Sequence, residues 1–172
     1  MKKAIWIMAG LLAAGISEAK DKFTQEVRGA LAGSAFYSHL ANIRGADEIY
    51  LGYDSSGRLA SAVALGRIRS SARVTAMVRV RRHEAGYAIE EVEILDADKI
   101  KDGARRRSLQ DMAVTLQGAL IQDGSGKELP LDAISGATAS RKNTYEDFKA
   151  LAKAAAAALA ANPSRPKVPL IP

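Results

Sequence analysis

Hydrophobic and polar residues alternate most regularly in the middle of the chain. Between residues 74 and 80 every second residue is Val or Ala, which gives an extended segment one apolar face. Ala85-Gly86 provides a turn, and the apolar positions of the returning segment, residues 89–94, are spaced first by three residues and then by two. This pattern predicts an antiparallel hairpin with a β-bulge near Glu90-Glu91.

A second hairpin is predicted upstream of the first. Residues 49–53 and 59–65 are rich in apolar and aromatic side chains, and they flank Asp54-Ser55-Ser56-Gly57. An Asp at the start and a Gly at the end of a four-residue connection are typical of a tight turn.

Three other segments carry apolar residues at helical spacing. Residues 104–122 contain a clear stripe that Asp123-Gly124 ends, and a last helix is predicted after Ser140. Residues 20–45 predict a leading helix, although Gly29 and Gly33 weaken it. The stripes consist of Leu109, Met112, Ala113, Leu116 and Leu120, of Tyr145, Phe148, Leu151, Ala155 and Leu159, and of Val27, Leu31, Ser34, Ala35, Ser38 and Leu40.

These elements together predict an α+β fold, in which a mostly antiparallel sheet of hairpins has the helices after Ala104 and after Ser140 packed on one face. The expected organisation is a signal peptide (1–19), an N-terminal helical segment (20–46), one domain (47–161) and a tail (162–172). Four of the five prolines lie in the tail, which predicts an extended segment with no fold of its own.

The first nineteen residues have the order of a secretory signal. Lys2-Lys3 precedes an apolar run, and Ser17-Glu18-Ala19 has the small-x-small arrangement that signal peptidase cleaves. We expect cleavage between Ala19 and Lys20 and a periplasmic or secreted product. An uncleaved membrane anchor is the alternative, although the apolar run is short for a membrane span.

Composition narrows the chemistry. The chain has 172 residues, no Cys and two His, which excludes disulfides, thiolate metal sites and Cys-attached haem. His39 and His83 occur in no HExxH or HxH spacing, so no metal site is expected.

The charge balance is basic. The chain carries 25 Lys and Arg against 19 Asp and Glu, and loss of the signal peptide would leave a net charge of +5. Because the basic residues are scattered and the protein is expected to be exported, nucleic acid is not an expected partner. Arg79-Val80-Arg81-Arg82 and Arg105-Arg106-Arg107 are the dense clusters. They are interpreted either as a solvated strand edge and a solvated helix start, or as contacts for an anionic cofactor or an acidic protein.

The segment Asp132-x-x-Ser135-Gly136-Ala137-Thr138 is the motif that carries chemistry. It resembles the flavinylation motif of the FMN-binding domain family, which includes the FMN-carrying subunits of the sodium-pumping NADH:quinone oxidoreductase and of the Rnf complex. The resemblance implies that Thr138 carries FMN through a phosphoester, which a flavin transferase makes with FAD as donor. The family usually continues with x-Thr-Ser, whereas Ala139-Ser140-Arg141 follows here.

The residue types suit a phosphate tether. Thr138 supplies a hydroxyl, and the small residues Gly136 and Ala137 allow a phosphate to approach the backbone N–H groups. Asp132 could fix the loop, assist removal of the threonine proton, or be a solvated turn residue. Thr138 itself could be an ordinary cap of the following helix.

The residue at which that helix starts determines whether Thr138 lies next to the positive end of the helix dipole. A helix that begins near Ser140 directs its free N–H groups at the phosphoester, whereas Thr144-x-x-Asp147 resembles a capping box that starts the helix later.

The expected function is electron transfer between redox partner proteins at or outside the membrane, with covalent FMN as the redox group. No acid, base or nucleophile of a substrate site is recognised in the sequence, which favours a carrier over a stand-alone enzyme. The alternatives are a secreted binding or sensor module that holds flavin non-covalently or not at all, and a small flavin-dependent reductase.

Overall fold

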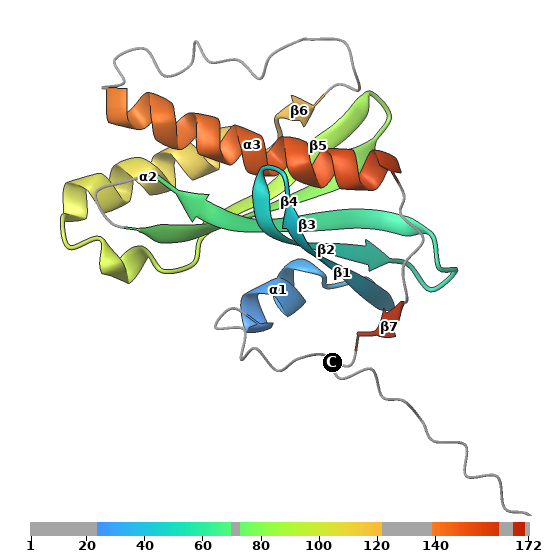
Figure 1. Cartoon of the computed structure of the whole chain (residues 1–172). Coiled ribbons are helices and arrows are strands. Elements are labelled where there is room, and N and C mark those ends of the chain that lie inside the picture. Colours follow the sequence, from blue (N-terminus) through green and yellow to red (C-terminus); the bar gives the residue numbers. More distant parts are fainter. Residues whose placement is uncertain (1–23, 70–72, 122–138, 162–166, 171–172) are drawn as a thin grey trace, which may run out of the picture.

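A computed structural model of the chain describes residues 24–69, 73–121, 139–161 and 167–170 (Figure 1). Within these ranges seven strands form one sheet in the order β6-β5-β4-β3-β2-β1-β7, and every pairing is antiparallel. The α+β class and the antiparallel sheet are thereby confirmed, while the expected signal peptide lies outside the described residues. The elements are α1 (Thr24–Ala30), β1 (Phe36–Ile43), β2 (Ala46–Tyr53), β3 (Leu59–Ile68), β4 (Val74–His83), β5 (Gly86–Ile94), a 3₁₀ turn (Ala97–Lys99), α2 (Gly103–Leu116), β6 (Leu120–Ile121), α3 (Ala139–Ala161) and β7 (Val168–Pro169).

Both predicted hairpins are present. In the turn between β2 and β3, the Oδ1 of Asp54 accepts hydrogen bonds from the backbone N–H groups of Ser56 and Arg58, both at 2.9 Å. Hydrogen bonds from Ser56 and from the backbone of Arg58 lower the pKa of Asp54 to about 2. Gly57 closes the turn with a φ of +78°, a conformation that favours glycine.

The predicted β-bulge is also confirmed. Arg79 pairs with Glu91 and the next residue, Val80, pairs with Ile89, so Glu90 is the extra residue of β5. Glu90, the extra residue of the bulge, forms ion pairs with two arginines of β4. Its carboxylate lies 3.1 Å from the Nε of Arg79 and 2.5 Å from the Nε of Arg81.

Two apolar clusters lie on opposite faces of the sheet. The buried residues of α2 and α3 form a single cluster with the strands. The stripe of α3 is buried as its spacing predicts, with Phe148 and Leu159 at the centre. On the other side Val27 of α1 and Leu31, which follows the helix, belong to a smaller cluster with Tyr50 and Met77.

The leading helix is much shorter than its prediction. It ends at Ala30, Gly33 follows with a φ of +89°, and Phe36–Ile43 forms strand β1 instead of continuing the helix. The reason is a contact distant in sequence, because β1 buries Ser38 and Leu40 and the Ser38 hydroxyl lies 3.1 Å from the Tyr53 hydroxyl. Within residues 24–46 only Thr24–Ala30 is helical, and Phe36–Ile43 belongs to the sheet of the domain.

The predicted extent of α2 is wrong at its C-terminal end. The helix ends at Leu116, and Gly118 turns the chain with a φ of +81°. Leu120 continues the helical spacing of the stripe, but it lies in β6, where it pairs with Ala88 of β5 and is partly exposed. The glycine two residues after the helix is the signal that marks this end.

The tail was predicted to have no fold of its own, and its described part instead joins the sheet. Val168 and Pro169 pair with Tyr37 and Phe36 of β1. Lys167 donates a hydrogen bond to the backbone oxygen of Gly57 at 2.6 Å, and its ammonium group lies 4.7 Å from the centre of the Tyr53 ring. Val168 and Pro169 are extended, as the prolines predict, and backbone pairing and the cation–π contact of Lys167 hold this described part of the tail.

Glycines allow the β1–β2 turn and β3 to approach α3 closely. Gly45 has a φ of +93°, and a Cβ atom there would lie 3.3 Å from the backbone oxygen of Ala150. A Cβ atom at Gly66 would lie 2.6 Å from the Cδ2 of Leu151. A Cβ atom at Gly66 would require the Leu151 side chain to move, and one at Gly45 would press on the backbone of α3.

We therefore expect Gly45→Ala to destabilise the protein by about 1–3 kcal/mol, because it adds backbone strain and a close contact with α3. Gly33→Ala is the matched control, since Gly33 has a φ of +89° and no atom within 4 Å of the added Cβ. Urea denaturation measures both. Equal losses in the two variants would contradict a contribution from the contact with α3.

Candidate functional site

The motif residues Asp132, Ser135, Gly136, Ala137 and Thr138 lie outside the described residues, so their roles stay predictions. The helix that follows the motif is described, and it begins at Ala139. Of the two predicted starts the earlier one is confirmed. The free N–H groups of α3 therefore belong to the residues immediately after Thr138.

A helix that starts at Thr144 would need Thr144 and Asp147 as its cap. Instead, both residues attach the helix to the end of β3. The hydroxyl of Thr144 donates to the backbone oxygen of Arg69. The carboxylate of Asp147 accepts from the backbone N–H of Arg69 at 2.7 Å and from its guanidinium at 2.8 and 3.0 Å. These hydrogen bonds raise the pKa of Arg69. We call these three residues the α3–β3 link.

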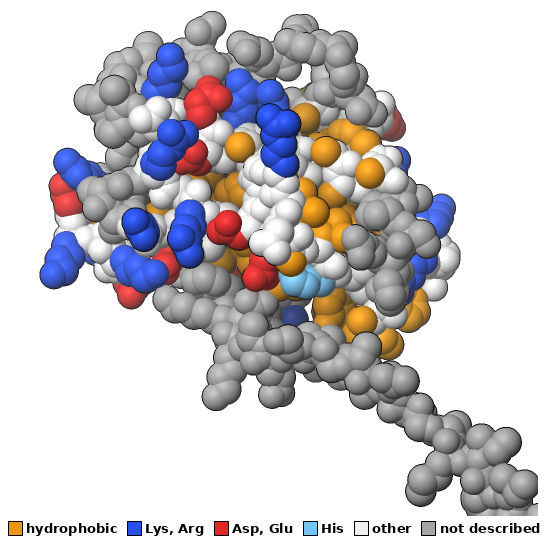
Figure 2. Space-filling view, in the orientation of Figure 1, with side chains coloured by type: hydrophobic (Ala, Val, Ile, Leu, Met, Phe, Trp, Pro, Cys, Tyr) orange, Lys and Arg blue, Asp and Glu red, His pale blue; other side chains and the backbone are white. Residues whose placement is uncertain are grey.

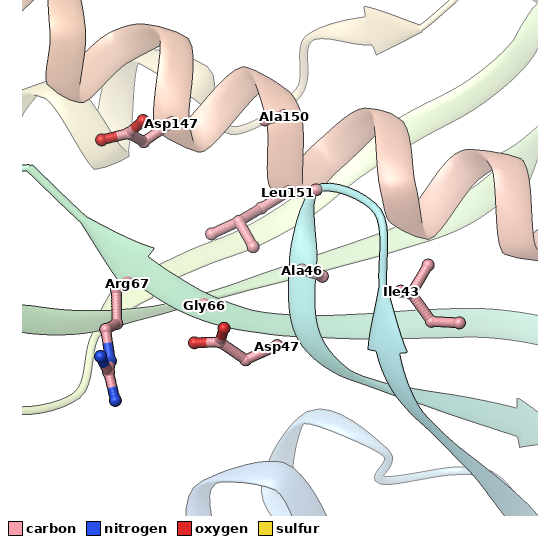
Figure 3. A pocket seen from close by; sticks show the side chains of 9 residues that line it. Ile43, Ala46, Asp47, Gly66, Arg67, Asp147, Ala150 and Leu151 are labelled. Atoms are coloured by element: carbon pink, nitrogen blue, oxygen red, sulfur yellow. The ribbon is translucent and has the colours of Figure 1, made fainter.

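A hollow of about 360 Å³ lies beside this link, between α3, the β1–β2 turn and the end of β3 (Figure 3). Leu151, Ile43 and Ala46 contribute apolar side chains to its wall. In Figure 3, the side chain of Asp47 lies below the helix and that of Arg67 extends from β3 away from α3. No sequence pattern singles out this site, because its wall comes from segments about a hundred residues apart.

The cluster Arg79–Arg82 is not a solvated strand edge, because β4 lies inside the sheet between β3 and β5. Arg79 and Arg81 contact Glu90 across the hairpin. Arg82 donates to the backbone oxygen of Leu159 at 2.9 Å, which satisfies one of the free carbonyl groups at the C-terminus of α3. These arginines stabilise the fold.

The cluster Arg105–Arg107 occupies the start of α2, as the solvated interpretation predicts. Arg105 and Arg107 are exposed and Arg106 is half-buried. Asp102 caps the helix by accepting from the N–H of Ala104 at 2.9 Å, and it lies 3.5 Å from the Nε of Arg105. Figure 2 shows Lys and Arg side chains spread over one face of the molecule, with Asp and Glu between them.

His39, Tyr50 and Glu48 form a polar group that no sequence pattern had indicated. It lies on the face of the sheet that α1 contacts. The rings of His39 and Tyr50 stack with centroids 4.7 Å apart, and the Tyr50 hydroxyl donates to Glu48 at 2.6 Å. The His39 Nε2 lies 3.5 Å from the same carboxylate oxygen. The alternation of polar residues in β1 and β2 is the signal that would have placed these side chains on one face.

Comparisons with protein-family models, with curated protein sequences and with solved structures give no match to this chain. Within the described ranges, no helix combines the length and apolar character needed to cross a bilayer. The same ranges hold no group of three or more His, Cys, Asp or Glu side chains placed to bind a metal ion.

The α3–β3 link gives a testable prediction. Asp147→Ala leaves the backbone N–H and the guanidinium of Arg69 without their carboxylate, so the thermal unfolding midpoint should fall by a few degrees. Asp111→Ala is the control, because Asp111 is an exposed aspartate of α2 whose carboxylate makes no hydrogen bond or ion pair with the described residues. Equal midpoints for the two variants, followed by circular dichroism, would contradict a stabilising link.

Proposed function

We propose that this protein is an exported flavoprotein that carries FMN through a phosphoester on Thr138 and transfers electrons between redox partners. The observation that carries the proposal is the segment Asp132-x-x-Ser135-Gly136-Ala137-Thr138, followed directly by the start of α3 at Ala139. The resemblance to the flavinylation motif and the position of the helix support the same site.

The helix start fits a phosphoester on the preceding residue. The first N–H groups of a helix have no partner inside it, and together with the helix dipole they stabilise negative charge. Ser135, Gly136 and Ala137 are small, so an approaching flavin transferase meets little bulk. The α3–β3 link holds the helix from which these N–H groups come.

Bound FMN would supply the redox chemistry, since the chain has no Cys and no haem attachment site. The role of the protein would be to hold the flavin and to dock with electron donors and acceptors. We also infer that α2 and α3 pack on the same face of the sheet. The buried cluster that α2 and α3 share with the strands supports it.

The proposal places the protein in the periplasm or outside the cell, after cleavage between Ala19 and Lys20. Its partners are a flavin transferase that uses FAD and redox proteins at or outside the membrane. A binding or sensor module with non-covalent flavin, or with none, is the alternative, and retention of the flavin after denaturation separates the two.

The covalent site is tested by mass spectrometry. When the protein is coexpressed with a compatible flavin transferase and exported, its intact mass should increase by one FMN phosphoester. Thr138→Val should abolish the adduct because it removes the accepting hydroxyl. Ser140→Ala is the matched control, since Ser140 is the next hydroxyl in the chain, and this variant should keep the adduct.

An adduct that persists in Thr138→Val, or that maps to another peptide, would contradict the site. Yellow colour lost on denaturation of the coexpressed wild-type protein would favour the non-covalent alternative.

Docking through the basic surface gives a second prediction. Reoxidation of the reduced, flavin-loaded protein by its acceptor protein should slow as ionic strength rises, because salt screens the attraction to an acidic partner. The Arg105→Glu, Arg107→Glu double variant should slow the reaction at low salt and reduce its salt dependence. These positions are chosen because both side chains are exposed, whereas Arg79, Arg81 and Arg82 hold the fold.

Arg28→Glu on α1 reverses one exposed charge on a different helix and is the control. If the stopped-flow rates of wild type and of both variants do not change with ionic strength, docking is not electrostatic. The positive net charge then contributes to solubility and not to partner binding.

A further inference from the structure

We infer that the outer edge of β1 is a docking site for an extended segment of a partner protein that carries a lysine three residues before an apolar side chain. Residues 167–170 of this chain already occupy one end of the site. β1 and β7 are the last two strands at this end of the sheet, and β7 pairs only with Phe36 and Tyr37 (Figure 1). The inference is independent of the proposed flavin.

The contacts of residues 167–170 define the chemistry that the edge accepts. The ammonium group of Lys167 donates to the Gly57 backbone oxygen at 2.6 Å and lies 4.7 Å from the centre of the Tyr53 ring. Leu170 donates its N–H to the Ala35 oxygen at 3.0 Å, and its side chain packs against the apolar cluster that α1 shares with the sheet. The edge therefore has one place for a cation and one for an apolar side chain.

The same pairing shows which backbone groups of β1 face outward. In an antiparallel pair, every second residue directs both its N–H and its C=O to the same neighbouring strand. Phe36 faces Pro169, which has no N–H, so Tyr37 is the residue whose backbone groups face β7. His39 and Ala41 follow at intervals of two residues, and their N–H and C=O groups point to the same outer side.

β7 covers only the first part of this edge. Within the described residues, no strand pairs with His39 or Ala41 on the outer side, and both residues are exposed. Asn42 has a φ of +56°, which interrupts the regular strand after Ala41. Residues 38–41 contain no Lys and no Pro, the residues that commonly protect sheet edges from pairing. This part of the edge is therefore suited to pairing with another segment.

A longer segment from outside can compete with the chain's own residues for this edge. Residues 167–170 belong to the same chain and therefore compete at a high effective concentration. A partner segment that extends past the position of Lys167 forms additional backbone hydrogen bonds with His39 and Ala41, which β7 does not make. In such strand addition the backbone supplies affinity and alternate side chains supply specificity. The described part of the tail is then an internal ligand that a longer partner strand displaces.

The test uses the full-length protein and a fluorescein-labelled long peptide, Thr-Val-Thr-Lys-Val-Pro-Leu. Its last four residues copy residues 167–170, and its first three would run beside residues 39–41. Fluorescence anisotropy should rise saturably as protein is added. The short peptide Lys-Val-Pro-Leu should bind about tenfold more weakly, because it forms none of the additional pairs.

Two methylated peptides and hydrogen exchange locate the long peptide. N-methylation of its third residue removes the donor to the His39 oxygen and should weaken binding. N-methylation of its second residue is the matched control, because the N–H of the residue opposite Leu40 points away from β1. Exchange of the Ala41 amide should slow when the unmethylated long peptide is bound.

The role of the tail as a competitor is tested in the protein. Lys167→Ala removes the hydrogen bond to Gly57 and the contact with Tyr53, so this variant should bind the long peptide about two- to tenfold more tightly than wild type. Lys153→Ala is the matched control, since Lys153 is an exposed lysine of α3, and its affinity should equal that of wild type.

The absence of a saturable rise in anisotropy with both wild type and Lys167→Ala would overturn the docking site. Equal affinities for the two methylated peptides would exclude pairing along β1, and equal affinities of wild type and Lys167→Ala would exclude the tail as a competitor. A wild-type dimer in analytical ultracentrifugation, with the Ala41 amide protected in the absence of peptide, would assign the edge to a second copy of the chain and overturn the assignment to a partner protein.

Discussion

The contact between α3 and one face of the sheet is the constraint on which the rest of the structure depends. Phe148, Leu151 and Leu159 of the helix are buried against the strands, and full burial of such a side chain contributes about 1.5–3 kcal/mol. The helix has alanine at most of its other buried positions, which brings its backbone close to the sheet. Gly45 and Gly66 complete this approach from the strands. The position of the helix start, of the α3–β3 link and of the hollow all follow from this one packing surface.

Local patterns predicted the elements whose cause is itself local. The alternation between residues 74 and 80 predicted β4, and the change of spacing in the returning strand predicted the bulge at Glu90. The buried face of α3 was also predictable, because Tyr145, Phe148 and Leu151 repeat at helical spacing regardless of what they pack against.

Elements that depend on distant contacts were not predicted. Strand β1 has few β-branched residues, and pairing with β2 along its whole length makes it a strand. Leu120 fits a helical stripe, but Gly118 turns the chain and pairing with β5 captures the next residues. Composition predicted an extended tail, whereas the contact of Lys167 with Gly57 joins residues 110 positions apart. The motif could be recognised from the sequence because its residues lie within seven positions of one another. The hollow could not, because its wall comes from segments about a hundred residues apart.

A phosphoester on Thr138 would directly precede a helix whose position the sheet fixes. The hydrogen bonds of Thr144 and Asp147 to Arg69 attach the N-terminal half of α3 to the end of β3. A tether on a helix that is held in place moves less than one on a free segment, which reduces the entropy lost when a partner docks. Under this proposal the close packing of α3 against the sheet, and not the motif alone, makes the domain suited to electron transfer.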